Sequence, residues 1–258
     1  MPDQKLFMLG SASGVPTARR NTTAACLQAG ARLYLLDAGD GCAGRMAGLG
    51  LDVNRVAAVF LSHMHIDHVG GLPLLLQTMQ LAGRKAPLDI CLPAEGRPGL
   101  EHWLNTVYLM PELLPFPLRW LGIRVRAPFY DDGCLRLRAR RNAHLQVRHA
   151  QLRASYPVRG QSYSFQLECG RRRIVYSGDI RELDEVLPLL SGGVADWLLL
   201  ECAHYPLDSA WAAFNGLAKT IVIHHIHPRL DRQGGAIKRA IKKHFTGKVV
   251  IARDGLVI

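Results

Sequence analysis

Three histidines and an aspartate lie close together in this chain, directly after an apolar run. They are His63, His65, Asp67 and His68, and the run before them extends from Ala57 to Leu61. Neutral imidazole and carboxylate groups suit Zn²⁺ and related divalent ions as ligands. So many polar groups beside a buried strand need a partner that offsets the cost of removing them from water. The cluster therefore predicts a metal site and, with it, a hydrolase.

The spacing within this cluster favours two metal ions. If the chain is still extended at His63, then His63, His65 and Asp67 share one side. His68 then points elsewhere. One ion could take the first two histidines, and a neighbouring ion could take Asp67 and His68. The alternative is a solvated loop or one structural ion, but structural zinc usually closes its shell with cysteines, and none lies nearby.

The pattern His-x-His-x-Asp-His, unbroken from His63 to His68, resembles the signature of the metallo-β-lactamase superfamily. The resemblance extends over nearly the whole chain. It implies an α/β (α+β) fold class, a four-layer αββα sandwich in which loops at strand ends hold a two-metal centre. It also implies a single domain over residues 1–258 and further metal ligands at the ends of later strands.

Two of these later ligands are expected at Asp179 and His225. Asp179 closes a short β-type run through a Gly-Asp turn and resembles the bridging aspartate of the superfamily. His225 follows a β-branched run that begins at Thr220, and it resembles the last ligand. His224 and His227 compete with it. Neighbouring residues of a strand face opposite sides, so only one of His224 and His225 is expected to bind, and the family pattern favours His225.

The third histidine of the first ion has two candidates, His144 and His149. Members of the superfamily usually place this ligand in a turn before the strand that leads to the aspartate. His144 fits better, because it follows the strand-like run from Cys134 to Arg141. For His149 the expectation is a surface position in an arginine-rich loop.

Length and composition agree with one domain that buries a substantial core, because 48% of the 258 residues are hydrophobic. Strand-like and helical patterns alternate along the chain. The predicted strands cover residues 5–9, 24–28, 33–37, 56–61, 88–92, 162–168, 173–177, 197–201, 220–224 and 248–252. The predicted helices cover residues 72–83, 183–190, 210–217 and 235–245.

The beginning of the chain has no basic region followed by a long apolar stretch, and no segment is long enough to span a bilayer. We therefore expect a cytoplasmic protein that does not act at a membrane. Six cysteines are dispersed without any Cys-x-x-Cys pair, which predicts reduced thiols and no disulfide framework.

The chain is strongly basic, with a formal net charge of +11 and ten arginines between Arg136 and Arg173. This balance favours a negatively charged substrate or partner. The alternative is a basic surface without such a role. No motif typical of sequence-specific nucleic-acid binding stands out.

The N-terminal loop from Leu9 to Asn21 and the later stretch from Leu36 to Gly41 are similar to the phosphodiesterase branch, in particular to ribonuclease Z. Small residues in the loop let the backbone approach a ligand, and Arg20, followed by Asn21, could contact a phosphate oxygen. A tight turn explains the glycines but not the arginines. Asp37 could orient a ligand histidine by a hydrogen bond.

Ribonuclease Z enzymes commonly carry a long arm between the third histidine and the bridging aspartate, and this arm grips tRNA. Only 35 positions separate His144 from Asp179 in this chain. The stretch from Glu201 to Pro206 instead resembles phosphoribosyl cyclic phosphodiesterases, although their N-terminal cysteine cluster has no counterpart here. His204 could protonate the leaving alkoxide while Glu201 holds its ring; alternatively, His204 caps the following segment.

Together these observations predict a phosphodiesterase that uses a hydroxide bridging two divalent ions, with Zn²⁺ as the default and Mn²⁺ as the alternative. The substrate would be an RNA 3′ end or a small cyclic phosphodiester, and Asp67 could orient the nucleophile. A lactam, thioester or other ester hydrolase is the competing prediction. A homodimer is compatible with the apolar stretch at 107–121, which could equally be core. The expected ligands are His63, His65 and His144 for the first ion, Asp67, His68 and His225 for the second, and Asp179 for both.

Overall fold

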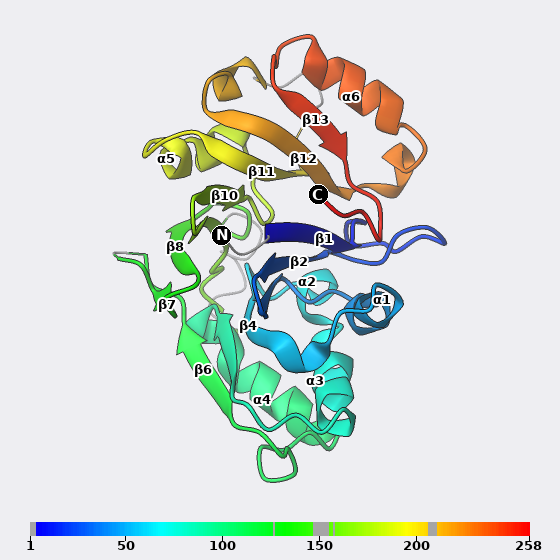
Figure 1. Ribbon diagram of the computed structural model, residues 1–258, viewed down its shortest axis with the longest axis vertical. Helices are drawn as coiled ribbons and strands as arrows, with labels where there is room; N and C mark the ends of the chain where they lie inside the picture. Colours follow the sequence, from blue (N-terminus) through cyan, green and yellow to red (C-terminus); the bar gives the residue numbers. More distant parts are fainter. Residues whose placement is uncertain (1–3, 126, 147–154, 157, 206–210) are drawn as a thin grey trace. The chain divides into compact units, whose positions relative to one another are not determined.

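The computed structural model describes residues 4–125, 127–146, 155–156, 158–205 and 211–258. Its chain forms two compact units. Unit one comprises Met1–Ile123 and Arg253–Ile258, and unit two comprises Arg124–Ala252. Each unit is built on one β-sheet with its own helices (Figure 1). That the two units make a single domain stays a prediction.

The sheet of unit one has six strands in the order β1-β2-β3-β4-β5-β6. The first three strands pair antiparallel, whereas β3 to β6 run parallel. The central strands β4 and β5 consist of almost uninterrupted apolar residues, as expected of parallel strands that are covered on both faces. The strands are β1 (Gln4–Gly10), β2 (Ala24–Ala29), β3 (Arg32–Leu36), β4 (Val56–Phe60), β5 (Leu88–Leu92) and β6 (Leu118–Gly122).

The helices of unit one are α1 (Cys42–Gly48), α2 (Ile66–Val69), α3 (Leu72–Leu81) and α4 (Arg97–Thr106). In α3 the buried side chains recur three or four residues apart, which places them on one face in the core of the unit. The last residues of the chain pair with β1, since the amide of Leu6 donates to Ile258 and that of Met8 donates to Leu256.

The sheet of unit two has the order β13-β12-β11-β10-β9-β8-β7. Strands β10 to β13 run parallel and β7 to β10 pair antiparallel. Its helices are α5 (Leu187–Leu190) and α6 (Gly234–Lys242). The strands are β7 (Tyr130–Asp131), β8 (Arg136–Arg141), β9 (Tyr163–Cys169), β10 (Arg172–Tyr176), β11 (Ala195–Cys202), β12 (Ala218–Ile226) and β13 (Lys248–Ile251).

All ten predicted strands are present, with bounds shifted by at most two residues. The prediction of a helix over 210–217 is wrong for its described part, 211–217, where a 3₁₀ turn, Trp211–Phe214, precedes β12. The helix predicted over 183–190 is split into a 3₁₀ turn and α5. Pro188 causes the split, since it has no amide hydrogen to donate to the preceding turn. Strands β6 and β7 and helices α1, α2 and α4 were not predicted.

Among the described residues, no helix combines the length and the apolar character needed to cross a membrane.

Candidate metal centre

In unit one the histidine cluster lies in the loop after β4 and in the first turn of α2. The expectation that His68 points away from His63 is wrong. Their ring centroids lie 4.1 Å apart, and those of His63 and His65 lie 4.7 Å apart. The reason is that the chain leaves the extended conformation and turns into a helix before Asp67, whose Oδ2 lies 3.5 Å from Nε2 of His68. All four side chains therefore gather at one edge of the sheet.

Asp37 anchors this cluster from the end of β3. Its carboxylate accepts hydrogen bonds from the amide and the hydroxyl of Ser62, at 2.6 and 2.8 Å. The same carboxylate lies 2.7 Å from Nδ1 of His68, with both side chains fully buried. A carboxylate at this distance accepts a hydrogen bond from the Nδ1 proton, so Nε2 of His68 carries the lone pair. Asp37 thus makes the hydrogen bond expected of it, and its role in orienting a metal ligand stays a prediction.

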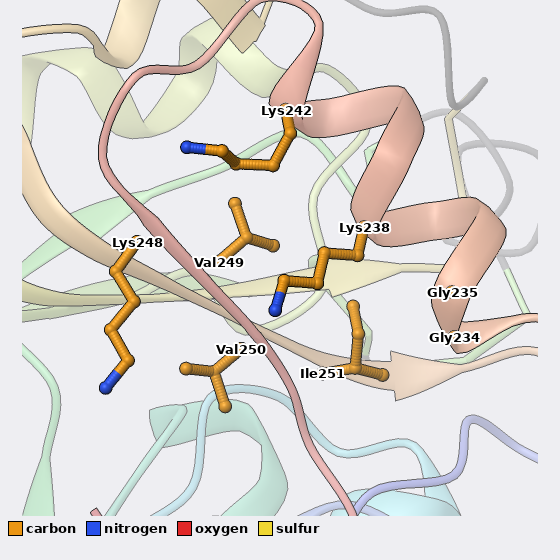
Figure 2. Close-up of a pocket in the computed structure, with 8 residues that line it drawn as sticks. All are labelled: Gly234, Gly235, Lys238, Lys242, Lys248, Val249, Val250 and Ile251. Carbon is orange, nitrogen blue, oxygen red and sulfur yellow. The ribbon is translucent and has the colours of Figure 1, made fainter.

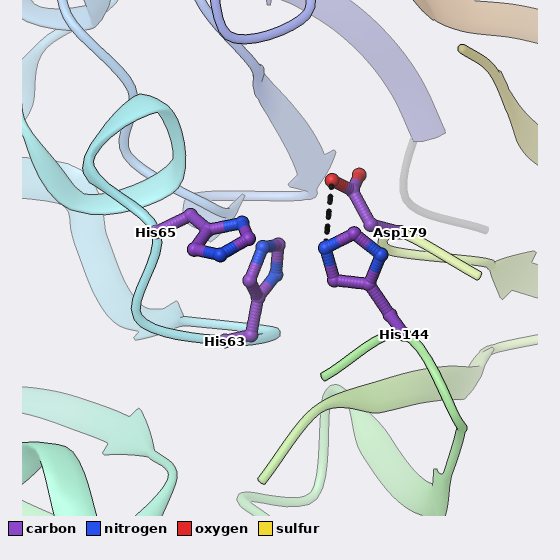
Figure 3. A group of neighbouring side chains, drawn as sticks. All are labelled: His63, His65, His144 and Asp179. Atoms are coloured by element: carbon purple, nitrogen blue, oxygen red, sulfur yellow. Dashed lines mark ion pairs between the residues drawn. The ribbon is translucent and has the colours of Figure 1, made fainter. Parts of the chain in front are cut away.

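In unit two the imidazoles of three histidines surround one oxygen of Asp179. Oδ2 of Asp179 lies 3.3 Å from Nε2 of His225 and 3.7 Å from Nε2 of His144, the latter pair joined by the dashed line in Figure 3. Nδ1 of His204 lies 3.9 Å from the same oxygen. Hydrogen bonds between charged groups are typically 2.7 to 2.9 Å long. For His144 and His225 these longer distances are typical of nitrogen atoms that converge on a common point, as metal ligands do, whereas Nδ1 of His204 is held by Glu201.

His204 is held by the buried carboxylate of Glu201, whose Oε1 lies 2.8 Å from Nδ1 of the ring. The other oxygen of Glu201 accepts hydrogen bonds from the amides of Ala203 and His204, at 2.7 and 3.2 Å. Burial raises the pKa of Glu201, and its hydrogen bond with His204 opposes that rise. The side chain of His204 is 30% exposed, unlike the other members of this cluster.

His144 follows β8 in a turn that Asn142 organises. The side chain of Asn142 accepts a hydrogen bond from the amide of His144 at 3.3 Å and donates one to the hydroxyl of Ser164 at 3.1 Å. The turn brings His144 beside Asp179, as predicted. The competing candidate, His149, lies outside the described residues. Asn142 was not singled out from the sequence, where it resembles any polar turn residue.

An irregularity in strand β12 gives the consecutive residues His224 and His225 different surroundings. Leu200 of β11 pairs with Ile223 and Cys202 pairs with Ile226, so two residues of β12 face one of β11 in a β-bulge. His225 adopts a left-handed backbone with φ of 51°. The structure brings His225 beside Asp179, as described above, whereas the ring of His224 stacks on Tyr176 with centroids 5.1 Å apart. His227 lies further on, where its Nδ1 accepts a hydrogen bond from the amide of Arg229.

Arg20 and Asn21 lie in a hydrogen-bond network that ties the N-terminal loop to the end of the chain. Nη1 of Arg20 donates to the hydroxyl of Ser11 at 2.7 Å, and that hydroxyl donates to Asp254 at 2.7 Å. The amide of Asn21 donates to the same aspartate at 2.6 Å. The guanidinium of Arg20 is thus part of the loop architecture, and its contact with a substrate stays a prediction.

The two clusters fit divalent metal ions. Each combines imidazole nitrogens with a carboxylate, a donor set that suits Zn²⁺ and Mn²⁺. In unit two, donor atoms of Asp179, His204 and His225 lie within 4.8 Å of one another. In unit one, the contact between Asp37 and His68 is the carboxylate support typical of metal-binding histidines.

Comparisons with known proteins show what this chain is similar to. A family model described as a beta-lactamase superfamily domain matches residues 32–246. Ribonuclease Z of Pseudomonas putida (strain W619) is 38% identical over 130 residues, which is 49% of this chain and 39% of that protein. Ribonuclease Z of Natronomonas pharaonis is 26% identical, over 97% of this chain and 96% of the length of that protein.

Among solved structures, the metallo-β-lactamase fold protein YhfI from Bacillus subtilis superposes with a TM-score of 0.78 at 20% identity, over 99% of each chain. This likeness confirms the predicted fold. The match to the Pseudomonas protein, in contrast, spans less than half of that relative.

Proposed function

Because the chain belongs to the beta-lactamase superfamily, we propose that it is a metal-dependent hydrolase that cleaves phosphodiester bonds. The observation that carries this proposal is the convergence of His144 and His225 on one buried carboxylate oxygen of Asp179, with the Glu201-held ring of His204 beside them. The ribonuclease Z relatives support a phosphodiester as the substrate. We favour it over a lactam or a thioester for this reason and because the chain is strongly basic.

We assign the metal ligands to two ions, with Zn²⁺ as the default metal and Mn²⁺ as the alternative. When bound, the ions would lower the pKa of a water molecule and offset negative charge on the phosphate. One family model spans parts of both units, which supports a single catalytic domain. The proposed ligands are His63, His65 and His144 for the first ion (drawn with Asp179 in Figure 3), Asp67, His68 and His225 for the second, and Asp179 for both.

His204 is the proposed proton donor to the leaving oxygen. Glu201 holds its Nδ1, which leaves Nε2 to face a substrate. Its partial exposure supports this role, since a proton donor must be recharged from solvent after each turnover. Asp67 would orient the attacking water by accepting its hydrogen bond.

We also propose a cytoplasmic location. All six cysteines are free, and five of them are buried. Burial raises the pKa of the Cys26 and Cys42 thiols to about 12, so they stay protonated and unreactive. Free, unreactive thiols are typical of proteins from reducing compartments.

A homodimer would use the exposed apolar side chains of Val107, Tyr108 and Leu113.

A hydrolysis panel on protein reconstituted with Zn²⁺ or Mn²⁺ tests the proposed function. The panel compares a chromogenic bis-aryl phosphodiester, 2′,3′-cyclic nucleotides, phosphoribosyl cyclic phosphate and precursor tRNA with a chromogenic lactam and a thioester. We expect hydrolysis of the chromogenic diester and of at least one natural diester. Turnover of the lactam or the thioester without turnover of any diester would show that the proposal is wrong.

A further inference from the structure

A shallow groove of about 570 Å³ lies in unit two between helix α6 and the edge strand β13. Figure 2 shows the side chains of three lysines, Lys238 and Lys242 from the helix and Lys248 from the strand, around this groove. Val249, Val250 and Ile251 of β13 and the first two residues of α6 complete its lining. The groove is therefore cationic at its sides, with aliphatic side chains between them.

The segment that builds the groove has no acidic residue. Between Asp231 and Asp254 the sequence contains seven lysines and arginines, and none of the 22 residues is a carboxylate. No ion pair among the described residues involves any of the three lysines that line the groove. Their charges are thus not neutralised by the protein, and they attract a polyanion from solution.

The arginines of strand β8 offer a contrast. They recur at every second position and are exposed, as a nucleic-acid contact would require. However, Arg136 pairs with Asp131 at 2.8 Å, and Arg138 lies 3.8 Å from Glu168. These carboxylates cancel much of the charge of that strand. The groove beside α6 is therefore the better anion site of the two.

The groove is long enough to contact several consecutive backbone phosphates. Lys248 and Ile251 lie at opposite ends of β13, about 10 Å apart for an extended strand. Lys238 and Lys242 stand one helical turn apart, about 6 Å along the axis. Ile251 pairs with Ile223 of β12, two residues before His225. One end of the groove therefore lies at the same end of the strands as this proposed metal ligand.

We propose that this groove binds the phosphate backbone of a polynucleotide substrate. The inference rests on the proposed function, and it adds a site where the body of an RNA is held while a terminal phosphodiester is cleaved. Lysine ammonium groups bind phosphates without regard to sequence, so the groove would contribute affinity and not base specificity. A small cyclic diester would have no use for it.

The test measures RNA binding by fluorescence anisotropy, with a labelled hairpin that carries a single-stranded 3′ tail. A gel of the same samples checks that the RNA is intact when the anisotropy is read. The variant K238Q/K248Q is compared with K85Q/K243Q, which removes the same charge from exposed lysines that do not line the groove. Lys242 is left intact, because its Nζ also donates to the carbonyls of Thr246 and Gly247.

We expect K238Q/K248Q to weaken RNA binding by about tenfold. Loss of two contacts with duplex phosphates should also make the plot of log affinity against log salt shallower by about 1.8. The control variant should keep the wild-type slope. Equal effects of the two variants, or no effect of either, would overturn the proposal. So would a poly-glutamate peptide that binds the groove when the RNA does not, since the partner would then be an acidic protein.

The chromogenic diester separates this proposal from the proposed function. Its hydrolysis should proceed at the wild-type rate in K238Q/K248Q, because a small substrate does not reach the groove. RNA binding that depends on the groove, in a protein that hydrolyses no diester, would refute the proposed function alone. Diester hydrolysis together with RNA binding that is unchanged in K238Q/K248Q would refute only the proposed role of the groove.

Discussion

A carboxylate that holds a histidine by Nδ1 leaves Nε2 to face a metal or a substrate. This arrangement occurs in both units, as Asp37 with His68 and as Glu201 with His204, at 2.7 and 2.8 Å. The two pairs differ in exposure, because His68 is fully buried and the side chain of His204 is 30% exposed. A buried ring of fixed tautomer suits a metal ligand. A ring in contact with water suits repeated gain and loss of a proton.

Replacement of His204 by Ala tests this difference at the scale of one residue. We expect kcat for a diester with a poor alkoxide leaving group to fall by about 100-fold or more, because general acid catalysis contributes this much. Hydrolysis of a diester with a nitrophenolate leaving group, which needs no proton, should fall much less. Metal content, measured by mass spectrometry, should stay at the wild-type value.

The matched control is His102→Ala, which removes an exposed histidine of unit one and should change neither rate. An equal loss of rate for both leaving groups in the His204 variant would contradict a proton-donor role, since a general loss of structure or affinity would act on both.

At the scale of elements, the ends of strands place the polar side chains, and two of these ends are irregular. Asp37 after β3 and His225 in β12 both have positive φ, at 57° and 51°. Such backbone costs about 1 to 3 kcal/mol in a residue other than glycine and persists only where surrounding contacts hold it. At Asp37 these contacts are the hydrogen bonds to Ser62 and His68. At His225 the β-bulge reorients the chain.

The bulge assigns different roles to neighbouring histidines, which can be tested by paired substitutions. We expect His224→Phe to keep its metal content and most of its activity, because a phenyl ring can stack on Tyr176 as the imidazole does. His225→Phe should lose about one equivalent of metal per chain and most of its activity. Metal analysis after dialysis measures the difference. Loss of metal from the His224 variant alone would reverse the assignment.

At the scale of the whole molecule, each unit carries its own cluster of donors. Unit one has the Asp37-supported histidines, and unit two has the histidines around Asp179. If one centre binds ligands from both units, as proposed, the metal is a cross-link between segments that are distant in the sequence. Metal binding then stabilises the folded chain, because the unfolded chain does not present these ligands together.

Chelation should therefore lower the melting temperature. At a free metal concentration of about 100 times Kd, binding of one ion adds roughly 2.7 kcal/mol of stability. In a chain of this size that corresponds to a fall of about 5 to 10 °C for each ion removed, which differential scanning calorimetry can measure. The double variant H63A/H225A, which lacks one proposed ligand in each unit, should show no such response to metal. A response like that of the wild type in this variant would argue against the assigned ligands.

The sequence by itself determined most of the strands and the kind of chemistry, and its resemblance to a known superfamily implied the fold class. Apolar alternation and donor types are local properties, so β-type runs and the cluster from His63 to His68 could be recognised directly. The direction of His68, the bulge at His225 and the engagement of Arg20 with Ser11 were decided only by the tertiary structure. Each depends on hydrogen bonds or packing between segments far apart in the chain, and such contacts leave no periodic trace in the residues themselves.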